Sequence, residues 1–277
     1  MIGSIRKMIT SVNEGNVAQY NLPIGDGLIK LNDYIGEEIN FSYTGNIRCI
    51  HCARKTKKSF NQGYCYPCLV KLAQCDMCIM KPELCHYHAG TCREPVWGET
   101  NCLNDHYVYL ANTGKVKVGI TRHISSEVSS RWIDQGADQA LPIFRVSQRL
   151  ISGLVEKEVS KHIGDKTNWR LMLKGIATKI DLLKVRNNIK EITSPFVDEL
   201  INQYGIQSIS NIVADPVEIK YPVIQYPSKI KSINLDKTSD VSGKLLGIKA
   251  QYLILDEDRV INMRKYAGYE INFIDNL

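Results

Sequence analysis

The sequence lacks any long apolar run. Across 277 residues no such run approaches the roughly 18 residues that a transmembrane helix requires, and no apolar signal segment precedes the cysteines. The hydrophobic fraction of 44% and the charged fraction of 23% are ordinary for a globular protein. These values exclude an integral membrane protein, and we expect a soluble, cytoplasmic chain of about one to three domains.

Acidic residues are absent from residues 48 to 72, although the whole chain carries a net charge of only +6. The basic residues of this stretch are Arg48, Arg54, Lys55, Lys57, Lys58 and Lys71. Such a local positive field attracts polyanions, although a loop of this kind can also serve only solubility. We expect a nucleic-acid partner, DNA or RNA, and no membrane; the sequence leaves the oligomeric state open.

Cysteine is scarce outside one short region, since eight of the nine cysteines lie between Cys49 and Cys92. Most of them form pairs separated by two residues, a spacing that places two thiolates around one ion. A chain of this length with no signal segment favours metal over disulfides. The pattern therefore predicts two structural zinc sites, each with four protein ligands and no position left for a catalytic water.

The first predicted site resembles a zinc ribbon. Its ligands are Cys49, Cys52, Cys65 and Cys68. The preferred ligands of the second site are Cys75, Cys78, Cys85 and Cys92. His88 followed by Cys92 has finger-like spacing and is an alternative, and His86 and Cys102 are further candidates.

The two ends of the chain resemble each other. Residues 15–41 align without a gap to residues 247–273, with 12 of 27 positions identical, where chance would supply about one or two at ordinary residue frequencies. Both copies contain short alternating stretches typical of strands, with Gly36 or Gly268 at a turn or bulge. Because one copy is too small to fold alone, we expect the two to pack together in one β-rich unit.

Residues 106–170 alternate between strand and helix patterns. Two alternating runs flank Asn112-Thr113-Gly114, which predicts a hairpin. The elements expected after it are a helix from Ser125 to about Gln135, a strand from Pro142 to Val146, a helix over Leu150–Ile163 with Ser147 near its start, and a further helix from Leu171 that ends before Pro195. Residues 211–240, rich in proline, predict a linker or edge strands.

This order of residue types resembles the GIY-YIG nuclease superfamily. The matching stretches are Tyr107-Val108-Tyr109, Lys117-Val118-Gly119, Ile120-Thr121-Arg122, Ser129-Ser130-Arg131-Trp132, Gly153-Leu154-Val155-Glu156 and Lys166-Thr167-Asn168. The whole chain, with cysteine pairs directly before this domain, also looks like a bacterial family of zinc-cluster proteins. The resemblance implies a nuclease that cuts phosphodiester bonds with one divalent metal ion.

The resemblance also implies a role for each residue. Tyr109 would take the proton from the attacking water, and Arg131 would stabilise the charge of the transition state. Glu156 would hold Mg²⁺ or Mn²⁺, and Asn168 would orient the site. Lys117 stands where the family has its second tyrosine, and Tyr107 replaces a glycine; lysine can bind a phosphate but cannot act as a phenol. A nucleic-acid-binding protein without catalysis and a zinc-stabilised protein-interaction module therefore remain alternatives.

Together these observations predict an α/β (α+β) protein with a small mixed sheet of GIY-YIG type. Its expected parts are a first β-rich copy at 1–45, a zinc module at 46–105, a GIY-YIG-like domain at 106–170, a helical segment at 171–210 and a second β-rich copy at 211–277. The leading functional hypothesis is a metal-dependent endonuclease or phosphodiesterase.

Overall fold

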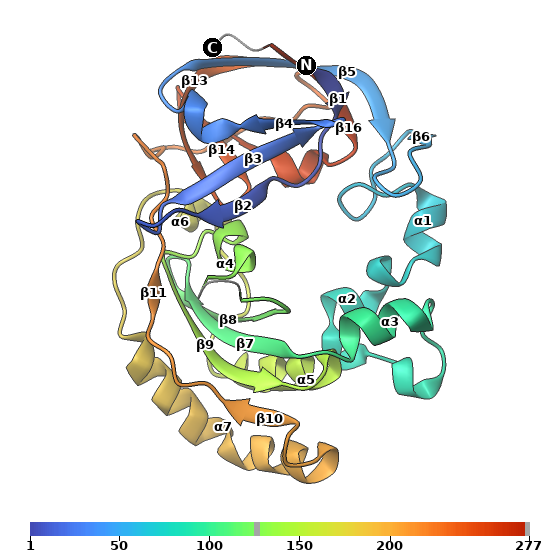
Figure 1. Ribbon diagram of the computed structural model, residues 1–277. Helices are drawn as coiled ribbons and strands as arrows, with labels where there is room; N and C mark the ends of the chain where they lie inside the picture. The colour runs from blue at the N-terminus through green and yellow to red at the C-terminus, as the bar shows by residue number, and fades with distance from the viewer. Residues whose placement is uncertain (125–127, 275–277) are drawn as a thin grey trace.

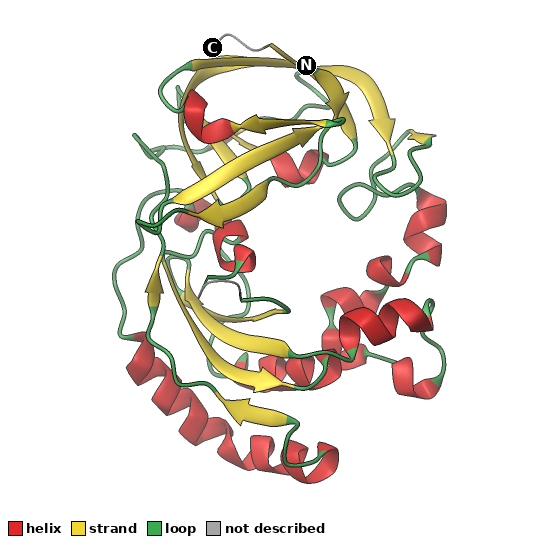
Figure 2. Cartoon of the chain, viewed as in Figure 1, coloured by secondary structure: helices red, strands yellow, loops and turns green. Residues whose placement is uncertain are grey.

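The computed structural model describes residues 1–124 and 128–274 and confirms a mixed α+β fold (Figure 1). Strands gather in the upper and central parts of the view and helices in the cysteine region and below the central sheet (Figure 2). Within the described residues, no helix is both long enough and apolar enough to span a bilayer.

The two repeat copies share one large sheet through their last strands, and the hairpin of the first copy lies in a second, smaller sheet. An eight-stranded sheet contains β1 (Ile2–Ser4), β5 (Glu38–Arg48), β6 (Lys55–Thr56), β12 (Lys231–Ser232), β13 (Asp240–Lys249), β14 (Tyr252–Leu255), β15 (Arg259–Asn262) and β16 (Tyr269–Ile274). A three-stranded sheet contains β2 (Ile9–Val12), β3 (Ala18–Ile24) and β4 (Gly27–Lys30). We call residues 1–48 and 231–274 the β clasp.

Each copy of the repeat forms a hairpin, a short 3-10 helix and a strand. The 3-10 helices are η1 (Leu31–Tyr34) and η5 (Met263–Tyr266). The last strands of the two copies, β5 and β16, pair antiparallel with Phe41 directly opposite Phe273, its equivalent in the other copy. The two rings stack with centroids 6.5 Å apart. Because equivalent residues meet in register, the pairing has an approximate twofold relation, and it joins the two ends of the chain.

A five-stranded sheet forms the centre of the molecule (Figure 1). Its strands are β7 (His106–Asn112), β8 (Val116–Thr121), β9 (Gln139–Val146), β10 (Ile209–Asn211) and β11 (Val217–Glu218). Alternate residues of β7 face opposite ways, as strand geometry requires: Val108 and Leu110 pack with α5 and α7, whereas Tyr109 and Ala111 join the core of the β clasp. The clasp therefore covers one face of the central sheet.

Helices complete the fold. In chain order these are α1 (Tyr66–Lys71), α2 (Met77–Met80), α3 (Pro95–Cys102), α4 (Ser130–Asp134), α5 (Arg149–Val159), α6 (Trp169–Met172) and α7 (Leu182–Tyr204). Short 3-10 helices in the cysteine region are η2 (Ala73–Cys75), η3 (Pro82–Leu84) and η4 (Tyr87–Ala89).

The helices differ from the sequence-based predictions at several ends. The helix expected from Ser125 begins at Ser130, and residues 125–127 lie outside the described part of the chain. Ser147 lies near the start of α5 as expected, directly before the N-cap Gln148, but the helix ends at Val159 and does not reach Ile163. The predicted helix from Leu171 is wrong over residues 173–181, because α6 ends at Met172 and α7 starts after the capping residue Asp181.

Two further boundaries differ from the sequence-based predictions: the end of the helix before Pro195 and the start of the second β-rich copy. Helix α7 continues through Pro195 because its buried face, which includes Ile189 and Val197, extends past the proline on both sides. Strands β10 and β11 pair with β9 of the central sheet. Residues 209–218 therefore complete that sheet, and the second β-rich copy does not begin at residue 211.

Candidate functional site and metal centre

Tyr109 and Gly119 face each other on the central hairpin. A Cβ atom at Gly119 would lie 2.5 Å from the Tyr109 hydroxyl oxygen, so a side chain there would displace the phenol. The ring of Tyr109 is fully buried and meets Trp132 edge to face at 5.8 Å between centroids. The glycine of the second motif thus has a physical reason: it makes room for the tyrosine of the first.

The surroundings of Tyr109 keep its phenol neutral. Burial raises the pKa of Tyr109 to about 12, although the nearby Arg131 acts in the opposite direction. Its hydroxyl donates a hydrogen bond to the Gln135 Oε1 atom at 2.8 Å. A fully buried phenol with this pKa is a poor acceptor for a proton at neutral pH.

Lys117 lies two residues before Gly119 on the same face of β8, which is at the edge of the sheet. Only 5% of the residue is exposed, and its Nζ atom donates to the carbonyl oxygen of Asp165 at 3.3 Å. Burial lowers the pKa of Lys117 to about 8; the charge of Arg131 acts in the same direction and that of Glu156 opposes it. Lys117 is therefore a buried cation whose charge can be lost near neutral pH.

Glu156 lies on α5, which packs beside β7 and β8. Burial raises the pKa of Glu156 to about 6, while the charges of Lys117 and Arg131 lower it and that of Asp165 raises it. The four groups are thus near enough to act on one another. Asp165 follows Gly164, whose carbonyl accepts from the Val118 amide at 2.9 Å and so holds this segment against β8.

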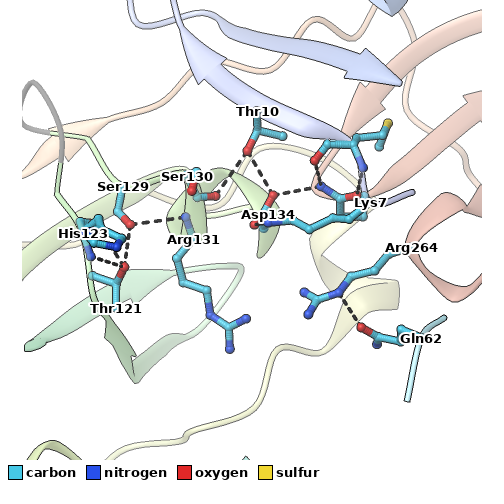
Figure 3. A network of polar contacts seen from close by, with 12 residues as sticks. Lys7, Thr10, Gln62, Thr121, His123, Ser129, Ser130, Arg131, Asp134 and Arg264 are labelled. Carbon is cyan, nitrogen blue, oxygen red and sulfur yellow. Dashed lines mark hydrogen bonds and ion pairs between the residues drawn. The ribbon is translucent and has the colours of Figure 1, made fainter. Parts of the chain in front are cut away.

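Arg131 projects from α4, a short helix held at both ends (Figure 3). At its start the Ser129 hydroxyl accepts from the Arg131 amide at 3.3 Å. Near its end the carboxylate of Asp134 pairs with Lys7 and accepts from the Thr10 hydroxyl at 3.0 Å. Asp134 also accepts from the Gln251 amide at 2.8 Å. The β clasp therefore fixes the helix that presents Arg131.

Arg264 is a residue of this site that the sequence reasoning missed. It comes from η5 of the β clasp, and Figure 3 shows its guanidinium pointing into the same space as that of Arg131. Burial lowers the pKa of Arg264, and the like charge of Arg131 adds to that effect. The equivalent residue of the first repeat copy is Asn32, which bonds to its own hairpin at the Tyr20 amide. In the sequence, the change from asparagine in the first copy to arginine in the second was the only sign that Arg264 has a role of its own.

Gln62 brings a third part of the chain to this space. It lies between the first two cysteine pairs, and its Oε1 atom accepts from the Arg264 Nε atom at 2.5 Å. The space in front of Arg131 is thus bordered by the central sheet, the β clasp and the cysteine region.

Asn168, expected to orient the site, is engaged at the start of a helix. It is the N-cap of α6, and its Oδ1 atom accepts from the Leu171 amide at 3.1 Å. The structure thus brings together Tyr109, Lys117, Arg131 and Glu156, and it adds Asp165, whereas it gives Asn168 a helix-capping role.

The first four cysteines form a group that can hold a metal ion. The sulfur atoms of Cys49, Cys52, Cys65 and Cys68 all lie within 4.8 Å of one another. A tetrahedron with zinc–sulfur bonds of about 2.3 Å has sulfur–sulfur edges of ~3.8 Å, and Cys52 and Cys65 lie 3.7 Å apart. Chiefly through the Arg54 amide, the pKa of Cys52 is lowered to about 6, which favours the thiolate.

Two residues of the predicted second site lie elsewhere. Cys75 packs against the first group, beside Tyr64 and Leu72. The Nε2 atom of His88 lies 3.1 Å from the Gln148 Oε1 atom. The other three predicted ligands, Cys78, Cys85 and Cys92, line one cavity. Cys102 lines the same cavity, whereas Cys75 and His88 do not.

The fold and site define a mixed α+β protein with a cysteine centre and a clustered set of charged groups on its central sheet. The chain belongs to the family DUF2797, described as a protein of unknown function, whose model matches residues 36–271. No curated protein and no solved structure matches the chain.

Proposed function

We propose that the protein is a metal-dependent nucleic-acid phosphodiesterase or endonuclease of the GIY-YIG type. The observation that carries the proposal is the meeting of Lys117, Arg131 and Glu156 beside the buried Tyr109. Lys117, Arg131 and Glu156 come from three separate elements; the types and order of Tyr109, Arg131 and Glu156 are among those on which the resemblance rests, whereas Lys117 departs from them. Hydrolysis of a phosphodiester needs cations on the phosphoryl oxygens, a positioned water and a metal ligand.

The cations bind and stabilise the phosphate. Arg131 and Arg264 point into one space, an arrangement that costs energy until an anion lies between them. Lys117 adds a third positive charge from the sheet edge. In the transition state, where negative charge grows on the phosphoryl oxygens, the guanidinium of Arg131 gives its largest stabilisation.

Glu156 is the ligand for Mg²⁺ or Mn²⁺. The oxygen donors fit these hard cations, since the carboxylate of Glu156 is ionised above a pKa of about 6 and Asp165 lies beside it. Such an ion, when bound, neutralises phosphate charge and makes a coordinated water more acidic. Because Glu156 and Asp165 supply few ligands, they would hold such an ion only with further oxygens from water or from the substrate phosphate.

Tyr109 has a positioning role in this proposal. Its proton is engaged with Gln135, and its pKa of about 12 disfavours the phenolate that a general base requires. The hydroxyl oxygen keeps a lone pair that can accept a hydrogen bond from the attacking water. The proton of that water then leaves to solvent or to a substrate oxygen.

The first cysteine group holds zinc in this proposal and places the substrate. Its four thiolates would fill the four positions of a zinc ion, so the ion would be structural. The exposed cations Arg54, Lys55, Lys57 and Lys58 follow the first cysteine pair, where they face solvent and are available to a nucleic-acid backbone.

A second candidate function is nucleic-acid binding without cleavage. The specific observation in its favour is that Lys117 stands where the GIY-YIG superfamily has its second tyrosine, while Tyr109 is wholly buried. The basic groups would then serve recognition alone.

One experiment separates the two functions. The zinc-loaded chain is incubated with single- and double-stranded DNA and RNA, with Mg²⁺ or Mn²⁺, and both cleavage and salt-dependent binding are measured. Nuclease function predicts metal-dependent cleavage of at least one substrate. Salt-sensitive binding with no cleavage of any substrate would establish the binder, and absence of both would contradict both functions.

A further inference from the structure

Four cysteines line one small cavity in the second half of the cysteine region. They are Cys78, Cys85, Cys92 and Cys102. Each comes from a different segment, because Cys78 lies in α2, Cys85 follows η3, Cys92 follows η4 and Cys102 ends α3. Four thiols around one cavity match the ligand number of a structural zinc site. In the part of the chain that the structure describes, no three of their sulfur atoms lie within 4.8 Å of one another, so a bound ion would have to draw them together.

The geometry of α3 directs Cys102 into this cavity. Gly98 and Cys102 are four residues apart and so share one face of the helix. A Cβ atom at Gly98 would lie 3.3 Å from the Cys92 sulfur and 3.0 Å from the ring of Tyr87. Because Gly98 has no side chain, α3 can pack directly against Cys92. Cys102, one helical turn further along the same face, lines the same cavity.

A buried cation lies beside these thiols. Arg149, the first residue of α5, interacts electrostatically with Cys102 and Cys78. Its Nε atom is buried, and no hydrogen-bond partner for it is found among residues 1–124 and 128–274. A zinc ion with four thiolates carries a net charge of −2, which a guanidinium offsets by charge and by N–H donation to sulfur.

We propose that Cys78, Cys85, Cys92 and Cys102 bind a second zinc ion, with Arg149 as the neighbouring cation. Cys102 therefore takes the place that the cysteine spacing gave to Cys75. Soft thiolate ligands and tetrahedral geometry select zinc over the hard divalent ions.

A rival ligand set exists in the same cavity. Donor atoms of Asp76, Cys78 and His86 lie within 4.8 Å of one another. However, Asp76 is engaged with the Arg93 Nε atom at 2.6 Å, an ion pair that competes with coordination by this carboxylate. The His86 Nδ1 atom lies 2.7 Å from the Thr91 hydroxyl, which leaves Nε2 available, so the experiment below has to decide on His86. In the proposed site these two residues surround the thiolates and do not coordinate.

The second zinc ion fixes the segment on which α5 rests. A Cβ atom at Gly153 of α5 would lie 2.3 Å from the backbone nitrogen of Glu83, so the helix touches this segment directly. The Arg149 Nη2 atom also donates to the carbonyl of Ile79 at 2.7 Å. The ion thereby orders the surface against which the helix of Glu156 packs.

Zinc content of the full chain tests the proposal. Elemental analysis is expected to give about two zinc ions per wild-type chain and about one for Cys102→Ser. The matched control Cys75→Ser is expected to keep both. A wild type with one zinc, a Cys102→Ser chain with two, or loss of zinc in Cys75→Ser would overturn the ligand assignment.

Cobalt substitution gives a second readout, and its wild-type part does not depend on the folding of a variant. The wild-type chain refolded with Co²⁺ is expected to show thiolate-to-cobalt charge-transfer absorption of equal strength for the first and second equivalents, and His86→Gln is expected to leave the spectrum unchanged. A weaker second increment, or a change of spectrum in His86→Gln, would show the rival Asp76, Cys78 and His86 set instead.

Discussion

Glu156 and Lys117 have pKa values that burial moves towards each other, to about 6 and about 8. Each is useful in its charged form: Glu156 as an ionised metal ligand and Lys117 as a cation for the phosphate. Because the acid must lose its proton and the amine must keep its own, both forms coexist only between these values. At the residue scale, we therefore expect the site to have both required charges only between about pH 6 and about pH 8.

The pH profile of cleavage follows from this pair. We expect kcat/KM, which reports the free enzyme, to rise as the pH passes about 6 and to fall as it passes about 8. Lys117→Arg, which stays charged, should remove the alkaline limb and keep the acidic one. An alkaline limb unchanged in Lys117→Arg would show that another group titrates there.

At the scale of elements, α4 depends on the β clasp for its position. Asp134 pairs with Lys7 and accepts from Thr10 and Gln251, so one carboxylate joins the helix to both ends of the chain. The residue is only 8% exposed. Removal of this carboxylate would leave buried donors without an acceptor, which costs more than the loss of a surface pair.

Asp134→Ala should therefore lower the free energy of unfolding by about 2–4 kcal/mol. Asp105→Ala, which breaks the more exposed pair with Arg145, is the matched control and should change it by less than about 1 kcal/mol. Urea denaturation monitored by tryptophan fluorescence measures both. Equal effects of the two substitutions would mean that Asp134 does not anchor α4.

Some elements could be predicted from the sequence and others could not, for physical reasons. The hairpin around Asn112-Thr113-Gly114 and the first cysteine group depend on local spacing, and both are present. The path of α7 through Pro195 depends on a buried face that only the folded chain provides. Cys102 and Arg264 join their clusters through tertiary docking, which no local pattern encodes.

At the scale of the whole molecule, the β clasp, the central sheet and the cysteine region meet around Arg131 and Arg264. The duplication explains this arrangement in part. Pairing of β5 with β16 joins the two copies, and the position held by Asn32 in the first copy carries Arg264 in the second. The clasp thus closes the chain and also supplies a cation to the site.

Arg264→Gln tests this contribution. If Arg264 binds a phosphate, the variant should weaken binding similarly for all sequences and reduce the salt slope by about 1. Lys184→Gln on α7 removes one exposed positive charge away from the site and should leave the slope unchanged. A slope unaltered in Arg264→Gln would exclude the clasp from phosphate binding.

Single-turnover cleavage with Mn²⁺ is the most direct test of the central claim that Glu156 completes a phosphodiesterase site. For the wild type and for the control Glu158→Gln, two residues further along α5 and so on another face of the helix, we predict equal, metal-dependent rates on a nucleic-acid substrate. For Glu156→Gln we predict a rate at least about 100-fold lower, with nucleic-acid binding retained. No cleavage by the wild type, or equal cleavage by Glu156→Gln, would contradict the account.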